Sequence, residues 1–126
     1  MTNTILVFIF GGIGSVLRYF TGTLSIKYFG TGFPYGTLAV NIIGCTLIGI
    51  FARVIPLPQY GGTELRLIFM TGLCGGFTTF SAFTLDAANL WMRGENSAAI
   101  TYIVASVVLS LIGVAIGLAI GKAFVS

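Results

Sequence analysis

Four long apolar stretches organise the chain, and short segments rich in glycine, proline or polar residues separate them. The stretches cover approximately residues 4–28, 35–55, 64–92 and 98–124. A helix of about 20 apolar residues crosses a bilayer. The intervening segments, Gly30–Pro34, Pro56–Gly62 and Arg93–Asn96, have the composition of turns and loops. We therefore expect an all-α integral membrane protein with four transmembrane helices, forming a single domain over residues 1–126.

The third stretch contains a sequence that disfavours a continuous helix. Gly75 and Gly76 lie in mid-span, where each glycine costs about 1 kcal/mol of helix propensity relative to alanine. Thr78 and Thr79 follow, and their hydroxyls can bond to the local backbone in place of the helical ladder. Non-helical backbone inside a membrane persists only where protein buries it or where it lines a watery path. We expect the third helix to be broken near Gly75–Thr79, at an ion or transport site.

Composition supports the membrane assignment and excludes several functions. The chain is 56% hydrophobic and only 7% charged, with a mean hydropathy of +1.05. Its net charge of +3 is scattered, which argues against nucleic-acid binding. It has no histidine and no pair of carboxylates at a spacing suited to acid–base catalysis, so we expect no enzyme. Cys45 and Cys74 are interpreted as small buried apolar residues rather than a disulfide or a metal site.

The cations that flank the stretches are almost evenly divided between the two sides of the membrane. They are Arg53, Arg66 and Lys122 on the side of the termini, and Lys27, Arg93 and the nearby Arg18 on the other. The positive-inside rule therefore selects neither orientation. A four-helix protein of this size also encloses little space on its own. Our hypothesis is that the chain inserts in both orientations and forms an antiparallel homodimer.

Two polar residues in the first and second stretches have alternative interpretations, because polar groups inside a membrane are costly and often functional. Arg18 either extends its charge to the interface or attracts anions into a vestibule. Asn41 carries two amide donors, which cost several kcal/mol if left unmatched in lipid. It either bonds to a neighbouring helix or donates to a passing anion, with Thr37 one turn earlier on the same face.

The third and fourth stretches add hydroxyls and aromatic rings. Tyr102, Ser106 and Ser110 are spaced four residues apart and form one polar stripe. The stripe suits an ion or a file of water molecules, or hydrogen bonds to neighbouring helices. Phe80 and Phe83 share a face after the expected break, either as core aromatics or with their positive ring edges towards an anion. Donors and positive edges without a fixed negative charge favour an anion over a cation.

Three segments together resemble the Fluc/CrcB fluoride channels: Gly75–Phe83 (GGFTTFSAF), Gly36–Asn41 (GTLAVN) and Gly11–Tyr19 (GGIGSVLRY). The resemblance extends over essentially the whole chain. It implies an antiparallel, dual-topology homodimer with two pores in a bacterial inner membrane. Such a channel passes fluoride passively and selectively, and so exports cytoplasmic fluoride. It also implies a structural sodium ion, Na+, at the dimer centre.

The resemblance also implies roles for individual residues. The sodium ligands would be the backbone carbonyls of Gly75 and Thr78. The fluoride pore would be lined by Asn41, Phe80, Phe83, Ser81, Thr37, Tyr102, Ser106 and Ser110, with Arg18 in the vestibule. Asp86 stands where the family has a glutamate, one methylene longer. Ala82 stands where the family often has threonine, so only Ser81 supplies a hydroxyl between the two phenylalanines.

Two other functions remain as alternatives. A small dual-topology drug or cation exporter would need a carboxylate embedded in the first stretch, and that stretch has none. A structural subunit of an assembly, with no transport role, would be favoured only if all the polar side chains formed hydrogen bonds with one another. The fluoride hypothesis is chemically consistent, because fluoride holds water tightly and a pore must replace that water with strong donors. Carbonyl oxygens likewise suit a hard cation such as sodium.

Overall fold

The computed structural model describes residues 1–125, and Ser126, the last residue of the expected domain, lies outside the described residues. This part of the chain is entirely helical apart from turns and loops. Within it, four segments are long and apolar enough to span a membrane: Thr2–Phe29, Tyr35–Val54, Thr63–Met92 and Asn96–Val125. The prediction of an all-α protein with four membrane-spanning segments is confirmed.

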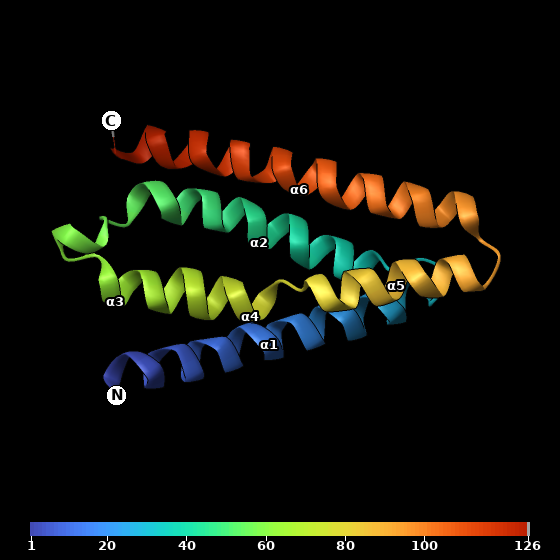
Figure 1. Cartoon of the computed structure of the whole chain (residues 1–126), viewed down its shortest axis with the longest axis horizontal. Coiled ribbons are helices and arrows are strands. Elements are labelled where there is room, and N and C mark those ends of the chain that lie inside the picture. The colour runs from blue at the N-terminus through green and yellow to red at the C-terminus, as the bar shows by residue number, and fades with distance from the viewer. Residues whose placement is uncertain (126) are drawn as a thin grey trace.

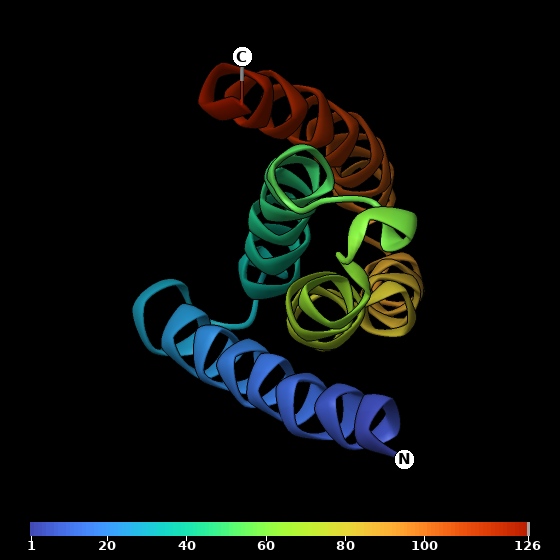
Figure 2. The ribbon, with the colours of Figure 1, turned by 90° about the vertical axis from the view of Figure 1, so that its left-hand side faces the viewer.

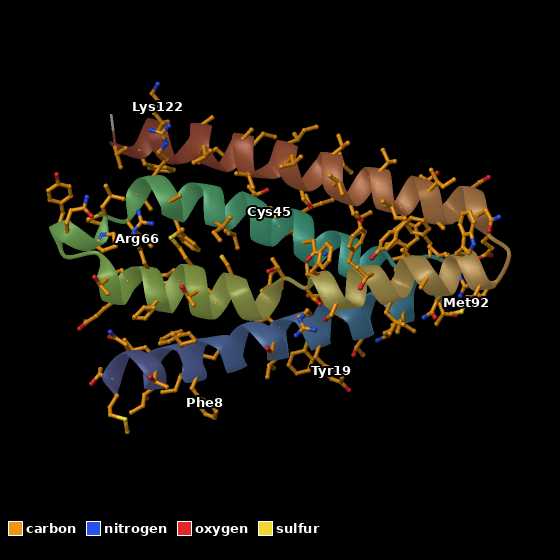
Figure 3. The ribbon with its side chains drawn as sticks, in the orientation of Figure 1. Phe8, Tyr19, Cys45, Arg66, Met92 and Lys122 are labelled. Carbon is orange, nitrogen blue, oxygen red and sulfur yellow. The ribbon has the colours of Figure 1, made fainter. Side chains whose placement is uncertain are left out.

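The four segments run up and down side by side (Figure 1). They are α1 (Thr2–Phe29), α2 (Tyr35–Val54), the composite third segment that ends in α5 (Phe80–Met92), and α6 (Asn96–Val125). Both termini lie at the same end as the α2–α3 loop, which contains η1 (Pro58–Tyr60). Arg66 and Lys122 lie at this end and Met92 at the other (Figure 3). Lys27 lies in the last turn of α1 and Arg93 directly follows α5, so these two cations lie at the same end as Met92.

Close packing of glycines brings the helices together. α6 packs extensively along α2, while α1 lies against the third segment (Figure 2). A side chain at Gly117 would collide with the carbonyl of Thr46, and one at Gly49 would collide with the carbonyl of Val114. Gly113, Gly117 and Gly121, which repeat every four residues late in α6, form a close-packing face, and α2 is the helix they contact.

The third segment changes conformation along its length. It consists of α3 (Thr63–Arg66), the π-helix η2 (Leu67–Cys74), the short α4 (Gly75–Phe77) and then α5. Between α4 and α5, Thr78 (φ −87°, ψ 160°) and Thr79 (φ −154°, ψ 122°) are extended. The π-helix was not predicted from the sequence.

The interruption lies within the expected range Gly75–Thr79 but only at its last two residues, because Gly75 and Gly76 are both helical in α4. Gly76 instead allows α1 to approach closely, since a Cβ at this position would collide with the carbonyl oxygen of Gly11. The extended residues are the two threonines, and Thr79 forms the N-cap of α5 by accepting a hydrogen bond from the Ala82 amide at 3.1 Å.

A small buried core lies near the end of the molecule away from the termini. It consists of Phe83, Leu90, Ala99 and Tyr102, and it joins α5 to α6. Most other large apolar side chains are exposed, including Phe8 and Tyr19, which point outward from α1 (Figure 3). Exposed apolar surface on every segment is what a lipid environment or a partner subunit would cover.

Arg66 fixes the opposite end of the molecule. Its guanidinium donates to the carbonyls of Ala52, Ile55 and Pro56 at 3.2, 3.0 and 2.9 Å. The last carbonyls of a helix have no intrahelical donor. Arg66 supplies donors for the end of α2 and thereby ties the α2–α3 loop to the start of the third segment.

Candidate functional site

A cavity of about 270 Å³ lies where α2, α6 and the extended Thr78–Thr79 segment meet. We call it the central cavity. Its lining residues are Asn41, Cys45, Thr78, Thr79, Phe80, Phe83, Ser106, Val107 and Ser110. Five of the residues that the sequence assigned to a pore therefore line one space, although three different segments supply them.

The two phenylalanines contact each other but have different surroundings. Their ring centroids are 5.6 Å apart. Phe83 is 8% exposed and packs against the ring of Tyr102, whereas Phe80 is 77% exposed. Phe83 is therefore both a core residue and a wall of the central cavity, while Phe80 extends from the surface of the isolated protomer.

The hydroxyl stripe on α6 divides into two parts. Ser106 and Ser110 line the central cavity. Tyr102 is fully buried outside it and donates to Asp86 Oδ2 at 3.2 Å. Ser106 Oγ is the one buried side-chain polar atom within residues 1–125 that lacks a hydrogen-bond partner. A buried hydroxyl without a partner costs about 1–3 kcal/mol, so a ligand or water in the central cavity would stabilise it.

Asn41 is bonded to the extended segment through both ends of its amide. Nδ2 donates to the carbonyl of Thr79 at 3.0 Å, and Oδ1 accepts from the amide of Thr79 at 2.8 Å. The interhelical hydrogen bond that the sequence left open is therefore present. This pairing uses one of the two protons that Nδ2 carries, and Asn41 also lines the central cavity.

Arg18 contacts the same segment from α1. Its Nε donates to the carbonyl of Gly76 at 3.1 Å. Arg18 also lines a second cavity of about 270 Å³, together with Thr37 and Thr79. A third cavity, of about 230 Å³, includes Thr37 and Asp86 in its wall. The second and third cavities share Thr37, and the second cavity shares Thr79 with the central cavity.

Ser81, which the resemblance assigned to the pore, does not line any of these three cavities. It is exposed, and its hydroxyl lies 3.3 Å from Thr79 Oγ1.

The carbonyls of Gly75 and Thr78 fit the binding of a hard cation. In a continued helix, the Thr79 amide would bond to Gly75 and the Ala82 amide would bond to Thr78. Both amides are used elsewhere, by Asn41 Oδ1 and by Thr79 Oγ1. Gly75 is also exposed on the protomer. The Gly75 carbonyl lies in the last helical turn before the interruption and carries partial negative charge, and backbone carbonyl oxygens are ligands for hard cations.

Two residues of the site, Thr79 and Cys45, were not assigned to it from the sequence. Thr79 both caps α5 and pairs with Asn41, and its signal was a threonine directly before an apolar helical run. Cys45 was interpreted as a buried apolar residue, but it is half-buried and lines the central cavity. Its signal was its position four residues after Asn41, on the same helical face.

Four membrane-length segments, with cavities between them that hydroxyl and amide side chains help to line, define a small multi-pass membrane protein. The chain belongs to the CrcB family, since the model of that family, described as "CrcB-like protein, Camphor Resistance (CrcB)", matches residues 5–118.

Curated bacterial relatives are similar over nearly their whole length. A "Fluoride-specific ion channel FluC" of Rhizobium etli is 52% identical over 114 residues, covering 90% of this chain and 91% of the relative. A protein of the same name from Rhizobium johnstonii is 53% identical over 114 residues, with the same coverage. Another, from Agrobacterium fabrum, is 47% identical over 122 residues, covering 97% of this chain and 98% of the relative.

Proposed function

We propose that this protein is a passive ion channel that lets fluoride leave the cytoplasm. Relatives that carry this function in their names match at about half of the aligned positions over nine-tenths of the chain. The single observation of the structure that carries the proposal is the unpartnered, buried Ser106 hydroxyl in the wall of the central cavity. Ion channels transport ions and do not catalyse reactions.

The chemistry of the central cavity suits a small anion. Ser106, Ser110 and the second amide proton of Asn41 are donors that replace part of the water around fluoride. The ring edges of Phe80 and Phe83 add weaker positive contacts. The charge of Arg18 at the neighbouring cavity raises the local anion concentration. Thr37, Ser81 and Tyr102 extend the set of hydroxyls beyond the central cavity.

The functional unit that we propose is an antiparallel homodimer of this single domain, with one pore beside each central cavity. The exposed Phe80 and Gly75 and the balanced flanking charges support it. Two copies would bring two sets of Gly75 and Thr78 carbonyls to one sodium ion. When bound, sodium supplies fixed positive charge within the low-dielectric membrane.

Fluoride efflux from liposomes tests the function. Purified protein would be reconstituted into vesicles loaded with potassium fluoride, and efflux would be started with valinomycin and followed with a fluoride-selective electrode. We expect fast fluoride efflux, with chloride efflux at the level of protein-free vesicles. Absence of fluoride efflux, or chloride efflux at an equal rate, would contradict the proposal.

Ser106→Ala is the matched variant for the central cavity. It removes a hydroxyl that has no partner in the protomer, so we expect the fold to be retained or slightly stabilised. Loss of one donor to fluoride corresponds to roughly a tenfold decrease in flux. A Ser106→Ala protein that conducts fluoride like the parent would contradict the assignment of the central cavity to the pore.

A further inference from the structure

Two side chains accept the backbone amides that an uninterrupted helix would direct at the carbonyls of Gly75 and Thr78. Asn41 Oδ1 accepts the Thr79 amide at 2.8 Å, and Thr79 Oγ1 accepts the Ala82 amide at 3.1 Å. These amides lie four residues after Gly75 and Thr78, respectively, and would be their donors in an uninterrupted α-helix. The extended conformation of Thr78 and Thr79 by itself leaves both amides to find new acceptors.

The carbonyls of the neighbouring residues Cys74 and Gly76 both accept hydrogen bonds. The carbonyl of Cys74 accepts from both the amide and the hydroxyl of Thr78, each at 2.9 Å. The carbonyl of Gly76 accepts from Arg18 Nε at 3.1 Å. The carbonyls of Cys74 and Gly76 therefore both have donors, whereas the amides that a continuous helix would direct at Gly75 and Thr78 donate to other acceptors.

We propose that Asn41 and Thr79 are positioning residues for a cation site made of the Gly75 and Thr78 carbonyls. By accepting the two amides, they hold the segment extended and prevent either amide from returning to the helical ladder. This inference rests on the proposed function, of which it explains the cation-binding part. It gives Asn41 two tasks, because the same side chain lines the central cavity.

The two roles of Asn41, holding Thr79 and lining the central cavity, depend on the same hydrogen bonds. Both polar atoms of the Asn41 amide are bonded to Thr79, and Thr79 directly precedes Phe80 in the wall of the central cavity. A change at Asn41 therefore displaces the carbonyl site and the wall of the central cavity together. Ser106 and Ser110 line the same cavity without bonding to this segment, so changes there affect the cavity alone.

Sodium-dependent thermal stability of the purified full-length protein tests the inference without measuring transport. A cation that binds the folded state raises its stability in proportion to the logarithm of its concentration above the dissociation constant. Melting would be recorded in sodium chloride and choline chloride series at constant ionic strength. We expect the parent and Ser106→Ala to be stabilised by sodium to the same degree.

The informative variants are a matched pair at Thr79. Thr79→Ser retains the hydroxyl that accepts the Ala82 amide, whereas Thr79→Val replaces it with a methyl group of similar size. We expect Thr79→Ser to respond to sodium like the parent. Thr79→Val and Asn41→Leu should need roughly tenfold more sodium, or more, for the same stabilisation.

The outcomes separate this inference from the transport function. Normal sodium dependence in both Thr79→Val and Asn41→Leu would overturn the inference while leaving fluoride transport intact. No sodium dependence in a parent protein that conducts fluoride would also overturn it. A parent protein that responds to sodium but passes no fluoride would contradict the proposed channel and leave the cation site standing. If Asn41→Leu fails to fold, the Thr79 pair alone decides.

Discussion

At the scale of single residues, the polar side chains in the membrane act first on the backbone. Asn41 pairs with Thr79, Arg18 donates to Gly76, and Thr79 caps α5. Each contact supplies a partner for a backbone group that the interruption of the third segment has released from the helical ladder. In lipid, a released group without a partner costs several kcal/mol. Residues that are candidates for transport therefore also stabilise the fold.

Phe80→Ile and Phe83→Ile should each lower fluoride flux. Each removes a ring edge whose contact is worth about 1 kcal/mol, which corresponds to roughly a five- to tenfold effect. Phe80 is 77% exposed on the protomer, so Phe80→Ile should barely change protomer stability. Liposome efflux measures the flux, and size-exclusion chromatography checks assembly. Unchanged flux in both assembled variants would remove the two rings from the pore.

Cys45 should make the channel sensitive to small thiol reagents. It lines the central cavity, whereas Cys74 is 2% exposed. A methanethiosulfonate reagent that adds a methylthio group to Cys45 would narrow a space of about 270 Å³, and we expect about a tenfold loss of efflux or more. The control, Cys45→Ala, should conduct in the presence of the reagent, and Cys74→Ala should remain sensitive.

Persistent inhibition of Cys45→Ala would show that the reagent acts elsewhere. Full activity of a parent protein in which mass spectrometry shows complete modification of Cys45 would exclude this residue from the conduction path.

At the scale of elements, glycines determine how closely the segments pack. Gly14 approaches the backbone of Leu73 and Phe77, and Gly76 approaches that of Gly11, so α1 lies directly against the third segment. Such close helix–helix contacts are stabilised by van der Waals packing, because the hydrophobic effect does not drive helices together within lipid. The position of the interrupted segment thus depends on residues without side chains.

Gly76→Ala should destabilise the protein, and Gly12→Ala should not. A Cβ at Gly76 collides with the Gly11 carbonyl, which is backbone and yields only if α1 moves away. Overpacking of this kind costs about 1–3 kcal/mol. A Cβ at Gly12 has no heavy atom within 4 Å, and alanine gains up to about 1 kcal/mol of helix propensity. Thermal melting in detergent should therefore show shifts of opposite sign, and equal shifts would contradict the packing described for α1.

At the scale of the whole molecule, large apolar side chains remain exposed along the outer segments. α1 and α6 lie on opposite sides of the other segments (Figure 2). Phe80 and Phe124 are among the exposed apolar side chains, each more than three-quarters exposed. The near-equal cation counts at the two ends favour insertion in both orientations, which would supply both halves of an antiparallel dimer.

Charge-biased variants test dual topology. Gln59→Lys with Tyr60→Lys adds two cations at the end of the termini, and Thr31→Lys with Ser97→Lys adds two at the other end. All four positions are exposed. Because cations direct a loop to the cytoplasm, each double variant should insert in one orientation. We expect each alone to give less than about a tenth of the parent's fluoride resistance in cells, and co-expression to restore it.

Full resistance from either double variant alone, with its single orientation verified by labelling of a loop cysteine introduced into a cysteine-free background, would contradict the antiparallel assembly. Failure of co-expression to restore resistance, with both proteins present in the membrane, would contradict it as well.

Much of the architecture follows from the sequence alone. The lengths of the apolar stretches determine four spanning segments, because a helix must satisfy its backbone within lipid. The spacing of Gly113, Gly117 and Gly121 identifies a close-packing face, since residues four apart share one side of a helix. Residue types and the family resemblance together select Asn41, Phe83 and Ser106 as candidates for one site.

Only the tertiary structure decided where the third segment is interrupted and which side chains hold the interruption. Glycine propensity favoured a break at Gly75 and Gly76, but Gly76 is helical where it packs closely on α1, and Thr78 and Thr79 are the extended residues. The pairing of Asn41 with Thr79 joins residues 38 positions apart. The local sequence determines which residues have a low helix propensity. Hydrogen-bond partners distant in the sequence, such as Asn41, determine which backbone groups leave the helical hydrogen-bond pattern.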